Sequence, residues 1–160
     1  MNSPTSLLHG ESLVWVTYDR GRGVSAALRW MLQTALTPLD VRLEVTEVES
    51  AVEAATQVEQ RQAGLLTLIP RSSECEAEWP ALCKTLRRVQ LRQGPCLRCV
   101  YASLPGLTDD LRLWEAGAQI VINQIPWLQR IVPRIVTCAP RRTGGNHPLT
   151  IGLVDRLPWA

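Results

Sequence analysis

The stretch VTYDRGRGVSA, from Val16 to Ala26, runs from an apolar strand into a glycine turn that opens a helix. The same succession recurs along the chain, where five apolar runs alternate with five helical patterns. This alternation is typical of a parallel sheet covered by helices on both faces, so we predict a single α/β domain. The expected strands are Leu13–Tyr18, Val41–Val48, Gly64–Ile69, Cys96–Ala102 and Gln119–Asn123.

Two of these strands have different patterns. Residues 41–48 alternate apolar and polar side chains, as an edge strand does, whereas GLLTLI at residues 64–69 is almost wholly apolar, as a buried central strand is.

The five expected helices each have a sequence signal of their own. The first has an apolar stripe of Val24, Ala27, Leu28, Met31, Leu32 and Ala35. The others are expected to begin with a capping box at Ser50 and Glu53, at Pro80, just before Asp109 and Asp110, and at Pro126.

Composition excludes several classes of protein. The 160 residues suit one domain, 46% of them are hydrophobic and 20% charged, and no apolar run approaches the roughly 20 residues of a membrane span. The net charge of +2 and the scattered arginines do not predict a nucleic-acid partner. Without a signal-peptide pattern we expect a cytoplasmic protein. The expected organisation is a flexible lead-in at 1–11, the domain at 12–139, and a linker with an apolar tail at 140–160.

Five cysteines, at positions 75, 83, 96, 99 and 138, are expected to be reduced. Cys96 and Cys99 form a C-x-x-C, but an offset of three residues on a strand points the two thiols to opposite faces. A redox pair favours a helix N-terminus, and the two histidines, His9 and His147, lie in the terminal segments. We therefore expect core cysteines, no metal and no cofactor.

The stretch EAGAQIVINQIPWL precedes the last helix, and in it Gly117, Ala118 and Pro126 match the pattern xGAxxYLxKPF. From Leu13 to Ala139 the chain thereby resembles the receiver domain of bacterial response regulators. The resemblance implies a flavodoxin-like, five-stranded parallel sheet in the order 2-1-3-4-5, with its chemistry at the carboxyl ends of the strands.

Receivers hold magnesium with acids after the first strand and accept phosphate on an aspartate that ends the third. A hydroxyl ending the fourth strand and a lysine ending the fifth hold the phosphoryl group. At the matching positions this chain has Asp19, Ile69 or Pro70, Tyr101 (Ser103 if the register slips), and Gln124 or Ile125, while its single lysine, Lys84, falls within a helix. Phosphoryl transfer would lack its nucleophile and its cation. The resemblance therefore implies a degenerate, non-enzymatic pseudo-receiver that works as a protein-interaction module in signalling or regulation.

A rival interpretation concerns the glycine loop. Gly21, Gly23 and Ala26 fit the dinucleotide motif G-x-G-x-x-A, with Glu47 as the ribose-binding acid of a nucleotide- or small-ligand-binding protein. A more modest version is an anion site at the helix N-terminus, formed by Arg20, Gly21, Arg22, Gly23 and Arg71. The arginines could equally be solvated, with one of them pairing with Asp19.

The place of each of the six tryptophans in the pattern predicts its role. We expect Trp15 and Trp30 in the core or packed on the sheet, and Trp79 as a loop anchor. Core packing is the first expectation for Trp114 and for Trp127 taken singly. Both also fall on the face that receivers use for dimers and partners, so they are candidate interface residues for a protein partner or a homodimer. The tail, with Ile151, Leu153, Val154, Leu157 and Trp159, is expected to dock on its own domain or on a neighbour.

Overall fold

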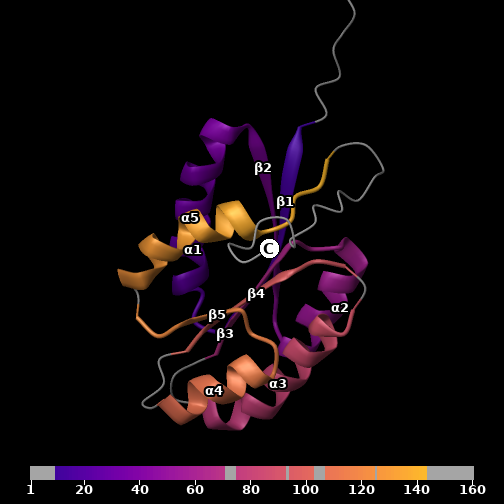
Figure 1. The fold of residues 1–160 in the computed structure, drawn as a ribbon, viewed down its shortest axis with the longest axis vertical. Helices are drawn as coiled ribbons and strands as arrows, with labels where there is room; N and C mark the ends of the chain where they lie inside the picture. The colour runs from indigo at the N-terminus through magenta and orange to yellow at the C-terminus, as the bar shows by residue number, and fades with distance from the viewer. Residues whose placement is uncertain (1–9, 71–74, 93, 103–106, 125, 144–160) are drawn as a thin grey trace, which may run out of the picture.

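A computed structural model describes residues 10–70, 75–92, 94–102, 107–124 and 126–143. Within them, strands and helices alternate along the chain, as the apolar runs predict (Figure 1). The elements are β1 (Glu11–Asp19), α1 (Gly23–Leu36), the 3-10 helix η1 (Thr37–Leu39), β2 (Val41–Val48), α2 (Ala51–Arg61), β3 (Leu65–Ile69), α3 (Cys75–Gln90), β4 (Leu97–Tyr101), α4 (Leu107–Glu115), β5 (Ile120–Ile122) and α5 (Pro126–Cys138).

The sheet has five parallel strands in the order β2-β1-β3-β4-β5, which confirms the predicted topology. β3 lies at the centre and all five of its residues are buried. β2 lies at an edge, as its sequence pattern predicts; Arg42 and Glu47 are exposed, but the four residues between them are all half-buried, so exposure does not alternate along the strand. An edge position also explains the charged residues of β2, since charge discourages pairing with another chain.

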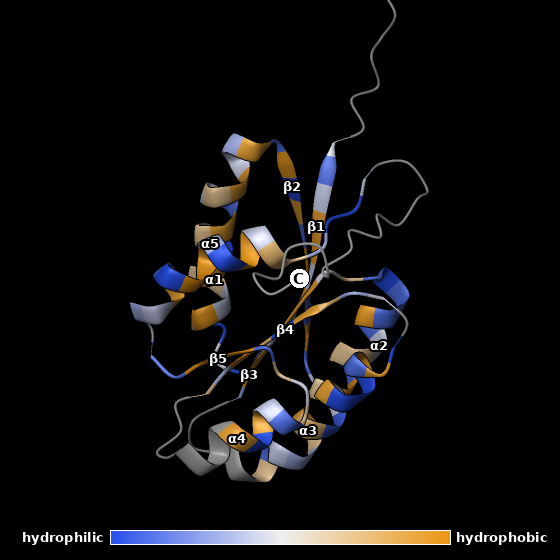
Figure 2. Cartoon of the chain, in the orientation of Figure 1, coloured by the Kyte–Doolittle hydropathy of each residue, from blue (hydrophilic) through white to orange (hydrophobic). Residues whose placement is uncertain are grey.

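Helices cover both faces of the sheet (Figure 1). α1 and α5 pack together on one face, while α2, α3 and α4 cover the other. Alternate side chains of β3 therefore enter different halves of the core: Leu65 faces α1 and α5, whereas Leu66 and Leu68 face the opposite layer. Each fully buried leucine contributes about 1.5–3 kcal/mol relative to exposure. In Figure 2 the apolar residues follow the central strands, which is where this burial occurs.

The helix ends follow local rules. Ser50 Oγ accepts a hydrogen bond from the Glu53 backbone N–H at 3.1 Å, and the Glu53 carboxylate accepts one from the Glu49 N–H at 3.2 Å. The predicted capping box is present, with the returning bond directed to Glu49 rather than to Ser50. α4 ends at Glu115, and Gly117 adopts the positive φ of 108° that glycine tolerates best.

Three predictions about single residues are wrong. α3 begins at Cys75 rather than Pro80, because the good helix formers Glu76, Ala77 and Glu78 extend it upstream of the proline. Trp79 consequently lies in this helix, partly buried against the α2–α4 layer, and is not a loop anchor. Trp30 is 67% exposed, because it points away from the side of α1 that buries Leu28 and Leu32. Lys84 lies within α3, as predicted, and its side chain is exposed.

The described parts of the two terminal segments contact each other. Glu11 begins β1, and Arg142 forms an antiparallel bridge with Ser12. The segment expected to be a linker therefore packs against the domain as far as Thr143, while 1–9 and 144–160 lie outside the described residues. None of the helices in the described ranges has the length and apolar character needed to cross a bilayer.

Candidate functional site at the end of β1

The carboxylate of Asp19 is bound by its own loop. Its Oδ1 accepts a hydrogen bond from the Gly21 N–H at 2.9 Å, and its Oδ2 accepts one from the Ser25 N–H at 2.8 Å. Ser25 is the third residue of α1, so its N–H is one of the donors that a helix start leaves without a partner. Arg22, with a left-handed φ of 57°, occupies the cap position without capping through its side chain. Asp19 therefore caps α1 from outside the usual position.

The residue opposite Asp19 is apolar. Asp19 pairs in register with Ile69 of β3, and both Ile69 and the following Pro70 are buried. Tyr101 ends β4 half-buried against the α1 and α5 layer, and Gln124 follows β5 as an exposed residue. The structure thus brings Asp19 beside Ile69, whereas among the described residues no hydrogen bond joins it to Tyr101 or Gln124. The alternatives Ser103 and Ile125, and also Arg71, lie outside the described residues.

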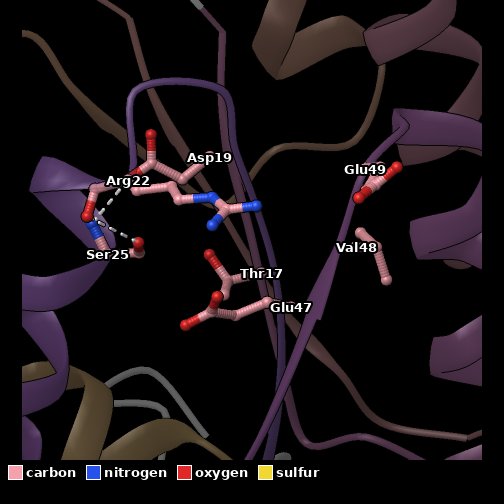
Figure 3. Close-up of a pocket in the computed structure, with 7 residues that line it drawn as sticks. All are labelled: Thr17, Asp19, Arg22, Ser25, Glu47, Val48 and Glu49. Atoms are coloured by element: carbon pink, nitrogen blue, oxygen red, sulfur yellow. Dashed lines mark hydrogen bonds between the residues drawn. The ribbon is translucent and has the colours of Figure 1, made fainter.

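A shallow pocket of about 220 Å³ opens between the Asp19 loop and the end of β2. Its lining consists of Thr17, Asp19, Arg22, Ser25, Glu47, Val48 and Glu49. Figure 3 shows the Arg22 guanidinium pointing into this space, above Thr17 and Glu47. Glu47 also pairs with Arg29 at 3.9 Å. Because three carboxylates and one guanidinium line the pocket, the local charge opposes an anion rather than attracting one.

Arg20 does not line this pocket and instead contacts Tyr18 and Glu78. Its Nε donates to the Tyr18 hydroxyl and to Glu78 Oε1, both at 3.0 Å, and the Tyr18 hydroxyl also donates to Glu78 Oε1 at 3.0 Å. This cluster ties the end of β1 to α3. Burial is the main cause that raises the pKa of Tyr18, and the hydrogen bond from Arg20 opposes it. Arg20 and Arg22 therefore have different neighbours, and no described contact joins them in one anion site.

The glycine loop lacks the features of a phosphate cradle. Gly21 and Gly23 have no positive φ, and a side chain at Gly23 would meet nothing within 4 Å. Asp19 already binds one N–H donor of the loop, at Gly21, and one at the start of α1, at Ser25. A dinucleotide-binding loop needs glycines that form a tight turn and free N–H donors that bind a phosphate. This loop has no glycine with a positive φ, and the N–H donors of Gly21 and Ser25 are already bound.

Cys96 and Cys99 have the buried environment that the strand pattern predicts, whereas Cys83 and Cys138 are half-buried at the margins of the core. Cys96 packs in the α2–α4 layer of the core and Cys99 in the α1 and α5 layer. Burial raises the pKa of the Cys96 thiol to about 12 and raises that of Cys99 as well. Across the part of the chain that the structure describes, no three His, Cys, Asp or Glu residues are placed to hold a metal ion.

Exposed aromatic side chains lie on the two helices beside β5. Trp114 of α4 is 49% exposed and Trp127 of α5 is 48% exposed. Leu111, also exposed, precedes Trp114 by one helical turn. Arg130 places its guanidinium carbon 5.6 Å from the centre of the Trp127 ring. Neither tryptophan is a core residue, in contrast to the fully buried Trp15, and Trp159 lies outside the described residues.

Known proteins resemble this chain in structure and not in sequence. Neither the protein-family models nor the curated protein sequences give a match. A response regulator from Thermotoga maritima superposes with a TM-score of 0.61 at 16% identity, over 80% of this chain and 98% of that one. The fold is that of a response-regulator receiver domain.

Two further structures share this receiver fold. An atypical orphan response regulator with a phosphorylation-independent regulatory mechanism gives a TM-score of 0.59 at 12% identity, covering 79% of this chain and 95% of that one. A CheY-like protein, tadZ of Pseudomonas aeruginosa, gives 0.57 at 14% identity, covering 81% and 95%. At these identities the likeness establishes the fold, so the function is argued from this chain's own residues.

Proposed function

We propose that this chain is a receiver-like module that acts through protein–protein contact in signalling or regulation, without phosphorylation of an aspartate. The observation that carries the proposal is the state of Asp19, whose two oxygens are bound by backbone N–H groups and whose partner in register is Ile69. The orphan regulator described above, with its phosphorylation-independent mechanism, is a structural precedent.

The chemistry of phosphoryl acceptance explains why these residues matter. Transfer to an aspartate needs a carboxylate nucleophile, a divalent cation and positive charge on the phosphoryl oxygens. Magnesium prefers an octahedral set of oxygen ligands. A single carboxylate whose two oxygens already accept hydrogen bonds from N–H groups supplies too few ligands for that geometry. With Ile69 and Pro70 where the acceptor would lie, we infer that the site has a structural role.

The interaction surface that we propose consists of Leu111, Trp114 and Trp127, beside the edge strand β5. Tryptophan is enriched among residues that dominate binding energy, because it combines a large apolar area with a polar N–H. The partner is another protein or a second copy of this chain, and a cytoplasmic location stays a prediction. The balanced charge does not favour a nucleic acid.

The chemical half of the proposal is tested by incubating the full chain with magnesium and acetyl phosphate and measuring its intact mass. A phosphorylatable receiver treated in parallel shows that the reagent works. We expect no phosphoryl adduct on this chain. A stoichiometric adduct that disappears in Asp19→Asn would overturn the proposal.

The contact half is tested by light scattering at high concentration and by comparing partner capture among three variants. Trp114→Ala and Trp127→Ala should weaken association, whereas Trp30→Ala, which removes an exposed tryptophan from α1, should not. The Trp30→Ala control distinguishes binding at this specific surface from non-specific hydrophobic association. A chain that is monomeric, with capture unchanged by the first two variants, would show that this surface is not the interface.

A further inference from the structure

The chain beyond α5 is fixed against the start of β1. The backbones of Ser12 and Arg142 exchange two hydrogen bonds of 2.7 Å each. Arg141 forms an ion pair with Glu11 at 3.0 Å. The carbonyl of Pro140 lies so close to Gly64 that a side chain at residue 64 would overlap it. Three independent contacts therefore set the position from which the chain continues after Thr143.

The direction of that continuation is also fixed. The bridge between Ser12 and Arg142 is antiparallel, so the chain runs opposite to β1, toward Gly10 and the amino edge of the sheet. β3 begins only at Leu65, opposite Trp15, so on this side the start of β1 has Arg142 as its neighbour instead of a strand. At Thr143, where the described residues end, the chain therefore points toward the amino edge, and 17 residues, 144–160, follow in the sequence.

A receiving surface lies beside this exit. It is a shallow hollow of about 540 Å³ between the first residues of β1, η1 and the first residues of β2. Its lining is Gly10, Glu11, Ser12, Thr37, Asp40, Val41, Arg42 and Glu44. Leu39, which lies in η1 between two lining residues, is 50% exposed. We call the lining together with Leu39 the amino-edge surface; it combines an exposed apolar side chain with charges of both signs.

The segment 151–159, IGLVDRLPW, has matching chemistry. Its apolar residues suit Leu39, and the adjacent Asp155 and Arg156 complement Arg42 and the acids of the amino-edge surface. Seven residues, 144–150, separate it from Thr143 and can span up to about 25 Å at the maximal rise of an extended chain. The surface is within that reach, since it includes Ser12, the partner of Arg142.

We propose that residues 151–159 fold back and bind the amino-edge surface of their own chain. A tethered segment has an effective concentration on the order of millimolar, whereas a second copy must first offset the entropy of association. The same weak contacts therefore favour the chain's own tail over a neighbour's. This proposal is independent of the one made for Asp19 and the tryptophans of α4 and α5.

The test is NMR spectroscopy of the full chain, following the Trp159 indole N–H signal, which is assigned by its loss in Trp159→Phe. Leu39→Ser and Leu91→Ser are matched variants, because both replace an exposed leucine and Leu91, at 86% exposure, follows α3 away from the hollow. We expect nuclear Overhauser contacts between the Trp159 ring and the Leu39 methyl groups. Leu39→Ser should shift the indole signal to the position of a solvated indole, and Leu91→Ser should leave it unchanged.

Each other outcome decides against the proposal. Contacts detected only between differently labelled copies in a mixed sample would assign the surface to a second chain. Contacts from Trp159 to Trp114 or Trp127 would place the tail beside β5 instead of on the amino-edge surface. An indole signal that is already that of a solvated group, and that neither variant moves, would show that the tail does not dock.

Discussion

Asp19 lies opposite Ile69 where β1 pairs with β3, and its carboxylate turns back to the N–H groups of the loop and of α1. An acidic side chain at the end of a first strand can coordinate a cation, or it can accept hydrogen bonds from the backbone of its own chain. Here the backbone provides both hydrogen-bond donors, so the energetic role of Asp19 is to stabilise the start of a helix. Asp19 therefore contributes to the stability of the fold.

Removal of that carboxylate should therefore destabilise the fold. Asp19→Ala leaves the N–H groups of Gly21 and Ser25 without their acceptor, and we expect the free energy of unfolding to fall by about 0.5–2 kcal/mol. Asp19→Asn keeps one acceptor oxygen and should cost less. Urea titration measures both. Added magnesium should leave the wild-type midpoint unchanged, since a ligand stabilises only a state that binds it. A more stable Asp19→Ala variant would contradict the capping role.

The buried polar contacts of β1 and β3 give a second prediction. Trp15 Nε1 donates to Thr67 Oγ1 at 2.9 Å, and Thr67 Oγ1 donates to Thr17 Oγ1 at 2.7 Å. Thr67→Val keeps the volume but leaves the indole N–H unpaired, at a cost of about 1–3 kcal/mol. Thr67→Ser keeps the hydroxyl and loses one methyl group, at about 0.8 kcal/mol. If denaturant unfolding finds the valine variant more stable than the serine variant, the hydrogen bonds are not what residue 67 contributes.

Some features follow from short-range patterns and others depend on distant residues. The edge position of β2, the capping box at Ser50 and the helix end at Gly117 each have a local signal, and the sequence predicts each of them. The partnership of Tyr18 and Arg20 with Glu78 joins segments about 60 residues apart, and no local signal indicates it. For Trp30, hydrophobicity alone predicts burial, whereas its position on α1 predicts the observed exposure. The apolar stripe of α1, which omits residue 30, already indicated the correct answer.

The link between α2 and α3 predicts a dependence on pH and salt. Arg88 donates to both carboxylate oxygens of Glu59, at 2.9 and 2.7 Å, and these bonds lower the pKa of Glu59 below its ordinary value of 4.5. A lowered folded pKa stabilises the protein above the unfolded value, and the contribution is lost as pH falls through the folded value. The pair is exposed to solvent, so a double-mutant cycle with Glu59→Gln and Arg88→Gln should give about 0.2–1 kcal/mol at neutral pH. The coupling should shrink in high salt and vanish below the folded pKa; a coupling that persists there would mean the pair does not act through charge.

Two glycines provide a matched pair for the last prediction. A Cβ at Gly64 would overlap the Pro140 carbonyl, whereas one at Gly23, the first residue of α1, would meet nothing within 4 Å. Gly64→Ala must displace either the start of β3 or the Pro140 segment, and overpacking of this kind costs about 1–3 kcal/mol. Gly23→Ala should be neutral or stabilise by up to about 1 kcal/mol, because it restricts the unfolded chain. Thermal unfolding compares the stabilities, and hydrogen exchange at the Ser12 amide reports directly on its bond to Arg142. Exchange should accelerate in Gly64→Ala alone. Equal exchange in both variants would mean that the Pro140 segment does not depend on its contact with Gly64, and the position of Thr143 would then rest on the Ser12 bridge and the Arg141 ion pair.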